Sequence, residues 1–243
     1  MTPAADWLLP DWPAPARVKA CVTTRAGGVS LPPFDTFNLG DHVEDDLQAV
    51  TLNRQRLSAR IECSPAWLRQ VHGIVVADAD PAIVAEADAS WTAKTGVACA
   101  VLTADCLPVL FCDRAGTRVA AAHAGWRGLA GGVLEATLAA LTVPASEVLV
   151  WLGPAIGPLA FEVGSEVRDV FLADHPQAAS AFVPSVNAGR FMADIYALAR
   201  LRLAACGVTA VYGGGFCTVT DPRFYSYRRA ARTGRFASLV WLD

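Results

Sequence analysis

Two histidines and one cysteine have the residue types of a transition-metal site. His72 stands in Q-V-H-G, Cys106 in T-A-D-C-L-P and His123 in A-A-H-A-G-W-R-G. Two imidazoles and one thiolate are a ligand set that zinc favours, and three protein ligands leave one coordination position open. An open position is typical of a catalytic metal rather than a structural one. We therefore take His72, Cys106 and His123 as candidate zinc ligands.

A predicted β-hairpin indicates how two of these residues meet. P-V-L-F-C and R-V-A-A-A-H are short apolar runs, and D-R-A-G-T between them has the composition of a turn. With Cys112 opposite Arg118, Leu107 falls opposite His123, and Cys106 lies beside that histidine at the open end. Opposed Cβ atoms lie about 5 Å apart. A register shift of one residue would change the face that each side chain occupies.

Each candidate ligand also has a simpler interpretation. A histidine among alanines is more often a hydrogen-bonded core residue, and a free cysteine usually packs in the core. Cys106, however, stands at a strand entrance and His123 opens a glycine-rich turn, where functional residues concentrate. The approach of His72 to the other two is an inference from residue type.

Composition limits the function classes. A chain of 243 residues with 53% hydrophobic residues fits a single domain over residues 1–243, with a large core. A net charge of −3 and only two lysines, Lys19 and Lys94, argue against nucleic acid as a partner. No secretory leader or membrane-length apolar run is visible, and seven cysteines lack paired spacing. We expect a cytoplasmic protein with reduced thiols and no membrane partner.

The expected elements mix helices and strands without a repeating unit. Three strands between Val97 and His123 follow one another with no intervening helix. The pattern predicts α+β with mixed sheets rather than a doubly wound fold. The expected helices span 47–61 after an acidic cap, 131–141, and Asp194 through Cys206; the other expected strands span 17–24, 147–152, 209–212, 224–228 and 236–242.

Well-known nucleotide and zinc signatures are absent. G-W-R-G-L-A-G-G follows neither the Rossmann nor the Walker pattern. The H-x-E with P-C-x-x-C pattern of cytidine-type deaminases and the H-E-x-x-H helix are also missing. Any zinc chemistry must therefore use a different scaffold.

Arginines beside glycines indicate an anionic ligand. Arg25 in T-T-R-A-G-G and Arg127 in G-W-R-G can each present a bidentate fork to phosphate, although a surface salt bridge is the simpler interpretation. The basic run from Arg228 to Arg235 is either a solvated turn or an anion-binding edge. Tyr225 and Tyr227 alternate with Ser226 and are expected on one strand face.

Together these motifs resemble the YfiH family, also called the multicopper polyphenol oxidase or laccase-like family. The resemblance rests on T-T-R-A-G-G, Q-V-H-G, T-A-D-C-L-P-V-L, A-A-H-A-G-W-R-G, L-G-P-A-I-G-P and F-Y-S-Y-R-R, and covers nearly the whole chain. It implies a layered α-β-β-α sandwich with mixed sheets, likened to cysteine hydrolases. It also implies a single zinc ion at the positions of His72, Cys106 and His123.

The resemblance further implies a purine nucleoside enzyme. The expected reactions are phosphorolysis of adenosine, inosine and 5′-methylthioadenosine, and deamination of adenosine to inosine, with nucleosides and phosphate as small-molecule partners. A zinc-activated water accounts for deamination, whereas phosphate binding suits arginine. We assign Arg25 to phosphate or the sugar and Asp105 to orienting the ligands.

Alternative functions use the same residues. Cys106 with His123 as its base is a candidate nucleophile for an amide, such as that of a peptidoglycan precursor. Copper polyphenol oxidation is disfavoured because four histidines, at 42, 72, 123 and 175, are too few for a multicopper centre. A non-catalytic metal-binding module is disfavoured by the open coordination position.

Overall fold

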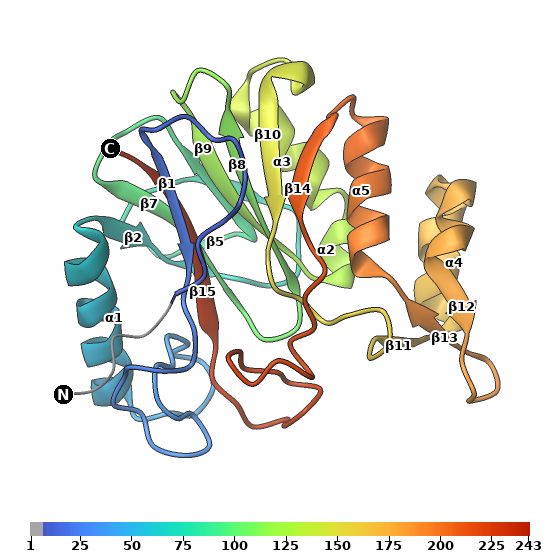
Figure 1. Cartoon of the computed structure of the whole chain (residues 1–243), viewed down its shortest axis with the longest axis horizontal. Coiled ribbons are helices and arrows are strands. Elements are labelled where there is room, and N and C mark those ends of the chain that lie inside the picture. The colour runs from blue at the N-terminus through green and yellow to red at the C-terminus, as the bar shows by residue number, and fades with distance from the viewer. Residues whose placement is uncertain (1–6) are drawn as a thin grey trace.

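The computed structural model describes residues 7–243 (Figure 1). One of its two large sheets has four strands. This sheet has the order β1 (Val18–Val22), β15 (Phe236–Leu242), β7 (Val97–Thr103) and β2 (Ser64–Ala66). The β1–β15 and β15–β7 pairs are antiparallel, and the β2–β7 pair is parallel. The strand nearest the end of the sequence thus lies inside the sheet rather than at its edge.

The second large sheet has six strands and is also mixed. Its order is β14 (Ala210–Gly213), β10 (Val148–Leu152), β8 (Leu107–Asp113), β9 (Val119–Ala124), β6 (Ala89–Thr92) and β4 (Val76–Asp78). The outer pairs β10–β14 and β4–β6 are parallel, and the inner pairs are antiparallel. The expectation of an α+β protein with mixed sheets is confirmed.

Smaller sheets and helices complete the described part of the chain. One small sheet joins β11 (Glu162–Gly164), β13 (Arg190–Ala193) and β12 (Phe182–Pro184), and another joins β3 (Leu68–Arg69) and β5 (Ala85–Glu86). The helices are α1 (Leu47–Ile61), α2 (Trp126–Gly131), α3 (Val133–Leu141), α4 (Ser165–Asp174) and α5 (Ile195–Ala205), with 3-10 turns at Ala145–Glu147 and Pro176–Ala181.

Strand alternation divides the core into three clusters. In β7, Cys99 and Val101 point to a cluster shared with the six-stranded sheet, whereas Ala100 and Leu102 point to a cluster shared with α1. The opposite face of the six-stranded sheet packs against α3 and α5. Because both faces of β7, β8 and β9 are covered, these strands are nearly continuous apolar runs.

Two predicted helix starts are confirmed. The carboxylate of Asp46 accepts the N–H of Gln48 at the start of α1. Asp194 caps α5 by accepting the N–H groups of Tyr196 and Ala197. Short polar side chains satisfy backbone donors that have no partner within the helix, which is why both were recognisable.

The predicted hairpin register and the predicted start of one helix are wrong. The β8–β9 hairpin forms, but Cys112 pairs with Val119, so Pro108 rather than Leu107 lies opposite His123. The helix expected over 131–141 begins only at Val133, because Gly132, at φ +103°, separates α3 from the preceding α2. Such a positive φ is accessible to glycine and ends the α2 turn.

The segment 224–228 forms a loop, not the expected strand. Tyr225 is fully buried and donates its hydroxyl to the carbonyl of Phe34 at 2.7 Å, whereas Tyr227 is 57% exposed. The N–H of Arg228 is donated to a carboxylate oxygen of Asp105. Because the segment is a loop in which Tyr225 is buried and Tyr227 is exposed, the two tyrosines do not share a strand face.

Residues 1–6, on which the expected lack of a leader partly depends, lie outside the described residues. Across residues 7–243, every helix is too short or too polar to cross a bilayer.

Candidate metal centre and cavity

Three different segments bring the candidate ligands together. Cys106 precedes the first residue of β8, and His123 lies near the end of the neighbouring β9. By strand alternation His123 shares the face of Val119 and Ala121, which points to the four-stranded sheet. His72 comes from the loop between β3 and β4, where its φ is +62°. The site therefore lies at one end of the core between the two large sheets.

The ligand atoms are close enough for one ion. The Sγ of Cys106 is 3.8 Å from the Nε2 of His72. The ring centroids of His72 and His123 are 4.8 Å apart, with the rings edge-on. One ligand atom from each of the three residues lies within 4.8 Å of the others. Zinc–sulfur and zinc–nitrogen bonds of about 2.3 and 2.1 Å span about 4.4 Å at most, so small side-chain rotations suffice to share an ion.

Asp88, which the sequence interpretation missed, organises two of the ligands. Its carboxylate, fully buried just before β6, lies 2.8 Å from the Nδ1 of His123. It also accepts the backbone N–H groups of Val71, His72 and Gly73 at 3.1, 2.9 and 2.6 Å. One carboxylate thus fixes the His123 ring and the loop that carries His72, and leaves the Nε2 of His123 for a metal.

The charge of Asp88 is maintained by these bonds. Burial alone would raise the pKa of its carboxyl, but the His123 ring and the N–H groups of Gly73 and Val71 outweigh it. The pKa therefore lies below its ordinary value of 3.8. The sequence signal was an acidic residue within the alanine-rich run A-E-A-D-A-S, directly before a buried strand.

Gln70 ties the same loop to the four-stranded sheet. Its side-chain amide accepts the N–H of Leu102 at 2.8 Å and donates to the carbonyl of Leu102 at 2.9 Å. This pair of bonds replaces a strand partner at the end of β7. The loop before His72 is therefore anchored on one side by Gln70 and on the other by Asp88.

The pKa of the Cys106 thiol and that of the His123 imidazole shift in opposite directions. Burial by itself raises the pKa of Cys106, yet the neighbouring His123 and His72 lower it from 9.0 to about 6. Burial lowers the pKa of His123, but the Cys106 thiolate and the Asp88 carboxylate raise it to about 9. Without a metal, Cys106 and His123 are consequently a thiolate–imidazolium pair at neutral pH.

A cavity of about 400 Å³ opens in front of the three ligands. Its apolar lining residues are Leu102, Trp126, Ile156, Phe161 and Ile195. Polar groups elsewhere on the lining come from His42, Gln70, Thr103, Asp105, Tyr227, Arg228 and Arg235. A concave, partly apolar site with a few convergent polar groups is typical of small-molecule binding.

Asp105 lies on this cavity at φ +100° but contacts other loops than the histidines. Its carboxylate accepts the hydroxyl of Thr218 and the N–H of Arg228, each at 2.6 Å. Its carbonyl accepts the N–H of Ile156 at 2.9 Å. Asp105 therefore gathers the loops that complete the cavity, while Asp88 contacts the candidate ligands.

The two arginines singled out from the sequence do not line the cavity. Arg25 pairs with Asp35, at 2.9 Å from its carboxylate, and packs over the ring of Tyr225. Arg127 is exposed and lies over Trp126. Arg228 and Arg235, the two ends of the basic run, take the positions on the cavity instead.

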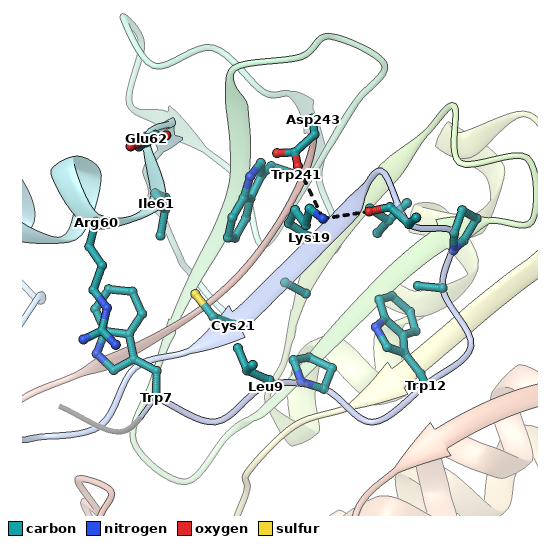
Figure 2. A pocket seen from close by; sticks show the side chains of 16 residues that line it. Trp7, Leu9, Trp12, Lys19, Cys21, Arg60, Ile61, Glu62, Trp241 and Asp243 are labelled. Atoms are coloured by element: carbon teal, nitrogen blue, oxygen red, sulfur yellow. Dashed lines mark hydrogen bonds and ion pairs between the residues drawn. The ribbon is translucent and has the colours of Figure 1, made fainter. Parts of the chain in front are cut away.

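A second hollow, of about 640 Å³, lies between the segment 7–16 and β1 (Figure 2). Lys19 in its lining pairs with Asp243 at 3.4 Å. Its cysteine, Cys21, has a pKa raised to about 12 because it is buried. No histidine lines this hollow within the described residues. The candidate metal ligands line the cavity beside Cys106 instead.

The His-Cys-His cluster on the lining of this cavity defines a candidate three-ligand metal centre of the catalytic type. The chain belongs to the family described as multi-copper polyphenol oxidoreductase laccase, which it matches over residues 19–243. This membership confirms the resemblance seen in the sequence.

Close relatives carry a more specific name. The chain is 73% identical over 238 residues to a Pseudomonas aeruginosa protein named purine nucleoside phosphorylase PA4543, covering 98% of both chains. It is 52% identical over 240 residues to an Escherichia coli protein named purine nucleoside phosphorylase YfiH, covering 97% of this chain and 98% of that protein.

Solved structures share the fold over almost the full length. The crystal structure of Neisseria meningitidis protein NMB0706 superposes with a TM-score of 0.95 at 55% identity, covering 98% of this chain and 99% of the other. The crystal structure of YlmD from Geobacillus stearothermophilus gives 0.90 at 30% identity, covering 100% and 98%.

Proposed function

We propose that this protein is a zinc-dependent purine nucleoside phosphorylase that also deaminates adenosine to inosine. The proposed phosphorolysis substrates are adenosine, inosine and 5′-methylthioadenosine, which yield the base and ribose 1-phosphate or its methylthio derivative. The observation that carries the proposal is the convergence of His72, Cys106 and His123 on one cavity. The names of the relatives supply the substrate class.

The donor set suits zinc. Two imidazoles and a thiolate of lowered pKa are ligands that Zn²⁺ binds, and the carboxylate–histidine contact of Asp88 and His123 is a frequent feature of zinc sites. A bound zinc ion would supply Lewis acidity to a ligand in the cavity. His72, Cys106 and His123 would hold it, and Asp88 would keep the ring of His123 in place.

Side chains of the cavity wall suit a purine nucleoside. Ile156, Phe161 and Ile195 offer buried apolar surface for a flat base, while the polar side chains on the lining offer hydrogen bonds to a sugar. The cavity volume of about 400 Å³ falls within the range of small-molecule sites. Apolar lining residues exclude water from a bound ligand, which strengthens its polar contacts.

Incubation of the purified, metal-analysed protein with adenosine tests this function. Phosphate-dependent formation of adenine is the expected result for phosphorolysis, and phosphate-independent formation of inosine is the expected result for deamination. Both should stop after chelation and return with zinc. Absence of adenine, inosine and hypoxanthine would reject the proposal.

A cysteine hydrolase is the second candidate. Cys106, His123 and Asp88 stand in the order nucleophile, base and orienting carboxylate, and the lowered pKa of Cys106 suits nucleophilic attack on an amide. Reactivity of the thiol with zinc present separates the two candidates. A multicopper oxidoreductase is less well supported, because only two of the four histidines join the cluster.

We further propose that residues 1–243 form one domain, with the three core clusters lying between the four layers of an α-β-β-α sandwich of the cysteine-hydrolase type. A cytoplasmic location accords with the proposed substrates and with cysteines that are all free within the described residues.

A further inference from the structure

Arg235 is a half-buried cation on the cavity without a carboxylate partner among residues 7–243. Its Nη1 donates to the carbonyls of Thr233 and Gly234, each at 3.0 Å, which fixes the side chain. Burial lowers its pKa, while negative charge on Cys106 and Asp105 opposes this effect. A desolvated guanidinium is costly unless an anion lies close by.

Arg228 lies on the same cavity and also lacks an ion-pair partner in the described part of the chain. Its guanidinium donates to the carbonyls of Ala160 and Glu162 at 3.1 and 3.3 Å, and its own N–H is bound by Asp105. These contacts hold the head group in position, and the Glu162 carboxylate acts on its charge only from beyond ion-pair distance. Both ends of the basic run are thus prepositioned cations.

Three arginines away from the cavity differ in this respect. Arg25, Arg202 and Arg223 each lie within 2.9 Å of a carboxylate oxygen, from Asp35, Glu135 and Asp221 respectively. None of these three lines the cavity. Arg235 and Arg228 therefore present two cations to the cavity without a direct ion pair, and Asp105 and Glu162 act on them only from beyond ion-pair distance. An anionic ligand in the cavity would pair with both directly.

His42 adds a neutral donor beside Arg235. Burial and the charge of Arg235 lower its pKa, against the opposing effect of Asp41. A neutral imidazole can donate to an anion without adding charge. Together the guanidinium forks and the imidazole provide the donors that a tetrahedral oxyanion accepts.

We propose that Arg235 and Arg228, with His42, form the binding subsite for inorganic phosphate; this inference rests on the proposed phosphorolysis. In that reaction an oxygen of HPO₄²⁻ bonds to the anomeric carbon as the carbon–nitrogen bond to the purine breaks. The electron pair of the broken bond leaves with the purine, which takes up the proton that phosphate carried. The two arginines hold phosphate for this attack and balance its charge.

The test compares Arg235→Gln, Arg235→Lys and Arg228→Gln in the zinc-loaded, full-length protein. Arg232→Gln is the matched control, since Arg232 is exposed, lies near Glu44 and is absent from the cavity lining. Phosphate binding is measured by titration calorimetry, and KM is measured separately for phosphate and nucleoside. Far-UV circular dichroism and thermal unfolding report whether each variant is folded.

Loss of a charge-assisted contact should raise the Kd and KM for phosphate about 10- to 100-fold in Arg235→Gln, with the nucleoside KM changed less than about twofold. Arg235→Lys should recover part of the loss, and Arg232→Gln should match the parent protein. If the parent protein is active and both glutamine variants keep its Kd and KM for phosphate, the subsite is overturned and the phosphorylase is still supported. If the parent protein shows no turnover but binds phosphate, and both glutamine variants bind phosphate more weakly, the subsite is supported and the phosphorylase is overturned.

Discussion

The Oδ1 atom of Asp88 lies 2.8 Å from the Nδ1 atom of His123 and also accepts the backbone N–H of His72. A single buried carboxylate thus links His72 and His123, which lie far apart in the sequence. The geometry of the candidate metal centre depends on this link as much as on the ligands themselves.

Asp88→Asn should weaken zinc binding about 10- to 100-fold, because an amide cannot accept all the N–H groups that the carboxylate accepts. Zinc affinity is measured by competition with a chromophoric chelator. Asp78→Asn, at the exposed end of β4, makes the same chemical change away from the site and should retain the parental affinity. Equal affinity in the two variants would refute the role of Asp88.

His72→Ala should leave the purified protein with little zinc and remove the rise in melting temperature that zinc causes in the parent, because binding to the native state stabilises it. Metal content by mass spectrometry and thermal unfolding check this prediction. His175→Ala is the control, since His175 ends α4 and does not join the cluster. Full zinc content and activity in His72→Ala would contradict the ligand assignment.

In the metal-free protein, alkylation of Cys106 should accelerate as the pH rises through about 6, rather than near 9 as for an ordinary thiol. The thiolate is the reactive form, so a lowered pKa makes the residue reactive at lower pH. Mass spectrometry after brief iodoacetamide treatment locates the label. Cys99 and Cys112, whose pKa values burial raises to about 12, are internal references.

Zinc should protect Cys106 from the same reagent, and a chelator should restore the reaction. Immediate alkylation of the zinc-saturated protein would instead favour the cysteine hydrolase, in which the thiolate is free to attack a substrate.

Gly125→Ala should lower zinc affinity while leaving the fold intact. A Cβ atom there would lie 2.8 Å from Cδ2 of His72 and 3.1 Å from Sγ of Cys106, so at least one ligand must move. The φ of Gly125 is −62°, which alanine adopts without strain. Gly131→Ala is the matched control, because its Cβ would approach only the Cγ2 methyl group of Ile74, at 3.1 Å. An unchanged zinc affinity in Gly125→Ala would mean that the ligands tolerate displacement.

Local chemistry made the hairpin of β8 and β9 predictable but not its register. The turn composition was visible, but the carboxylate of Asp113 accepts the N–H groups of Thr117 and Arg118 at 2.6 and 2.9 Å. These bonds close a longer loop and shift the pairing by one residue. Register depends on such turn geometry, which alternation alone does not specify.

Long-range contacts explain the remaining differences. The residue types of His72, Cys106 and His123 were sufficient to propose a metal site, whereas Asp88 becomes apparent only when its loop folds against β9. Arg25 stood beside glycines, as a phosphate ligand often does, yet its partner is Asp35. A motif shows which groups are available, and the tertiary fold decides which of them face the cavity.

His72 and Asp105 adopt φ angles of +62° and +100°, which glycine would tolerate better than either side chain. Laboratory evolution for heat resistance alone would therefore reward glycine at position 72, whereas the hydrogen bonds of the Asp105 carboxylate favour keeping that side chain. Such a campaign would discard one candidate ligand, and would return stable proteins with only Cys106 and His123 left to hold a cation. Any selection for a more robust version of this protein should consequently include a screen for turnover from its first round.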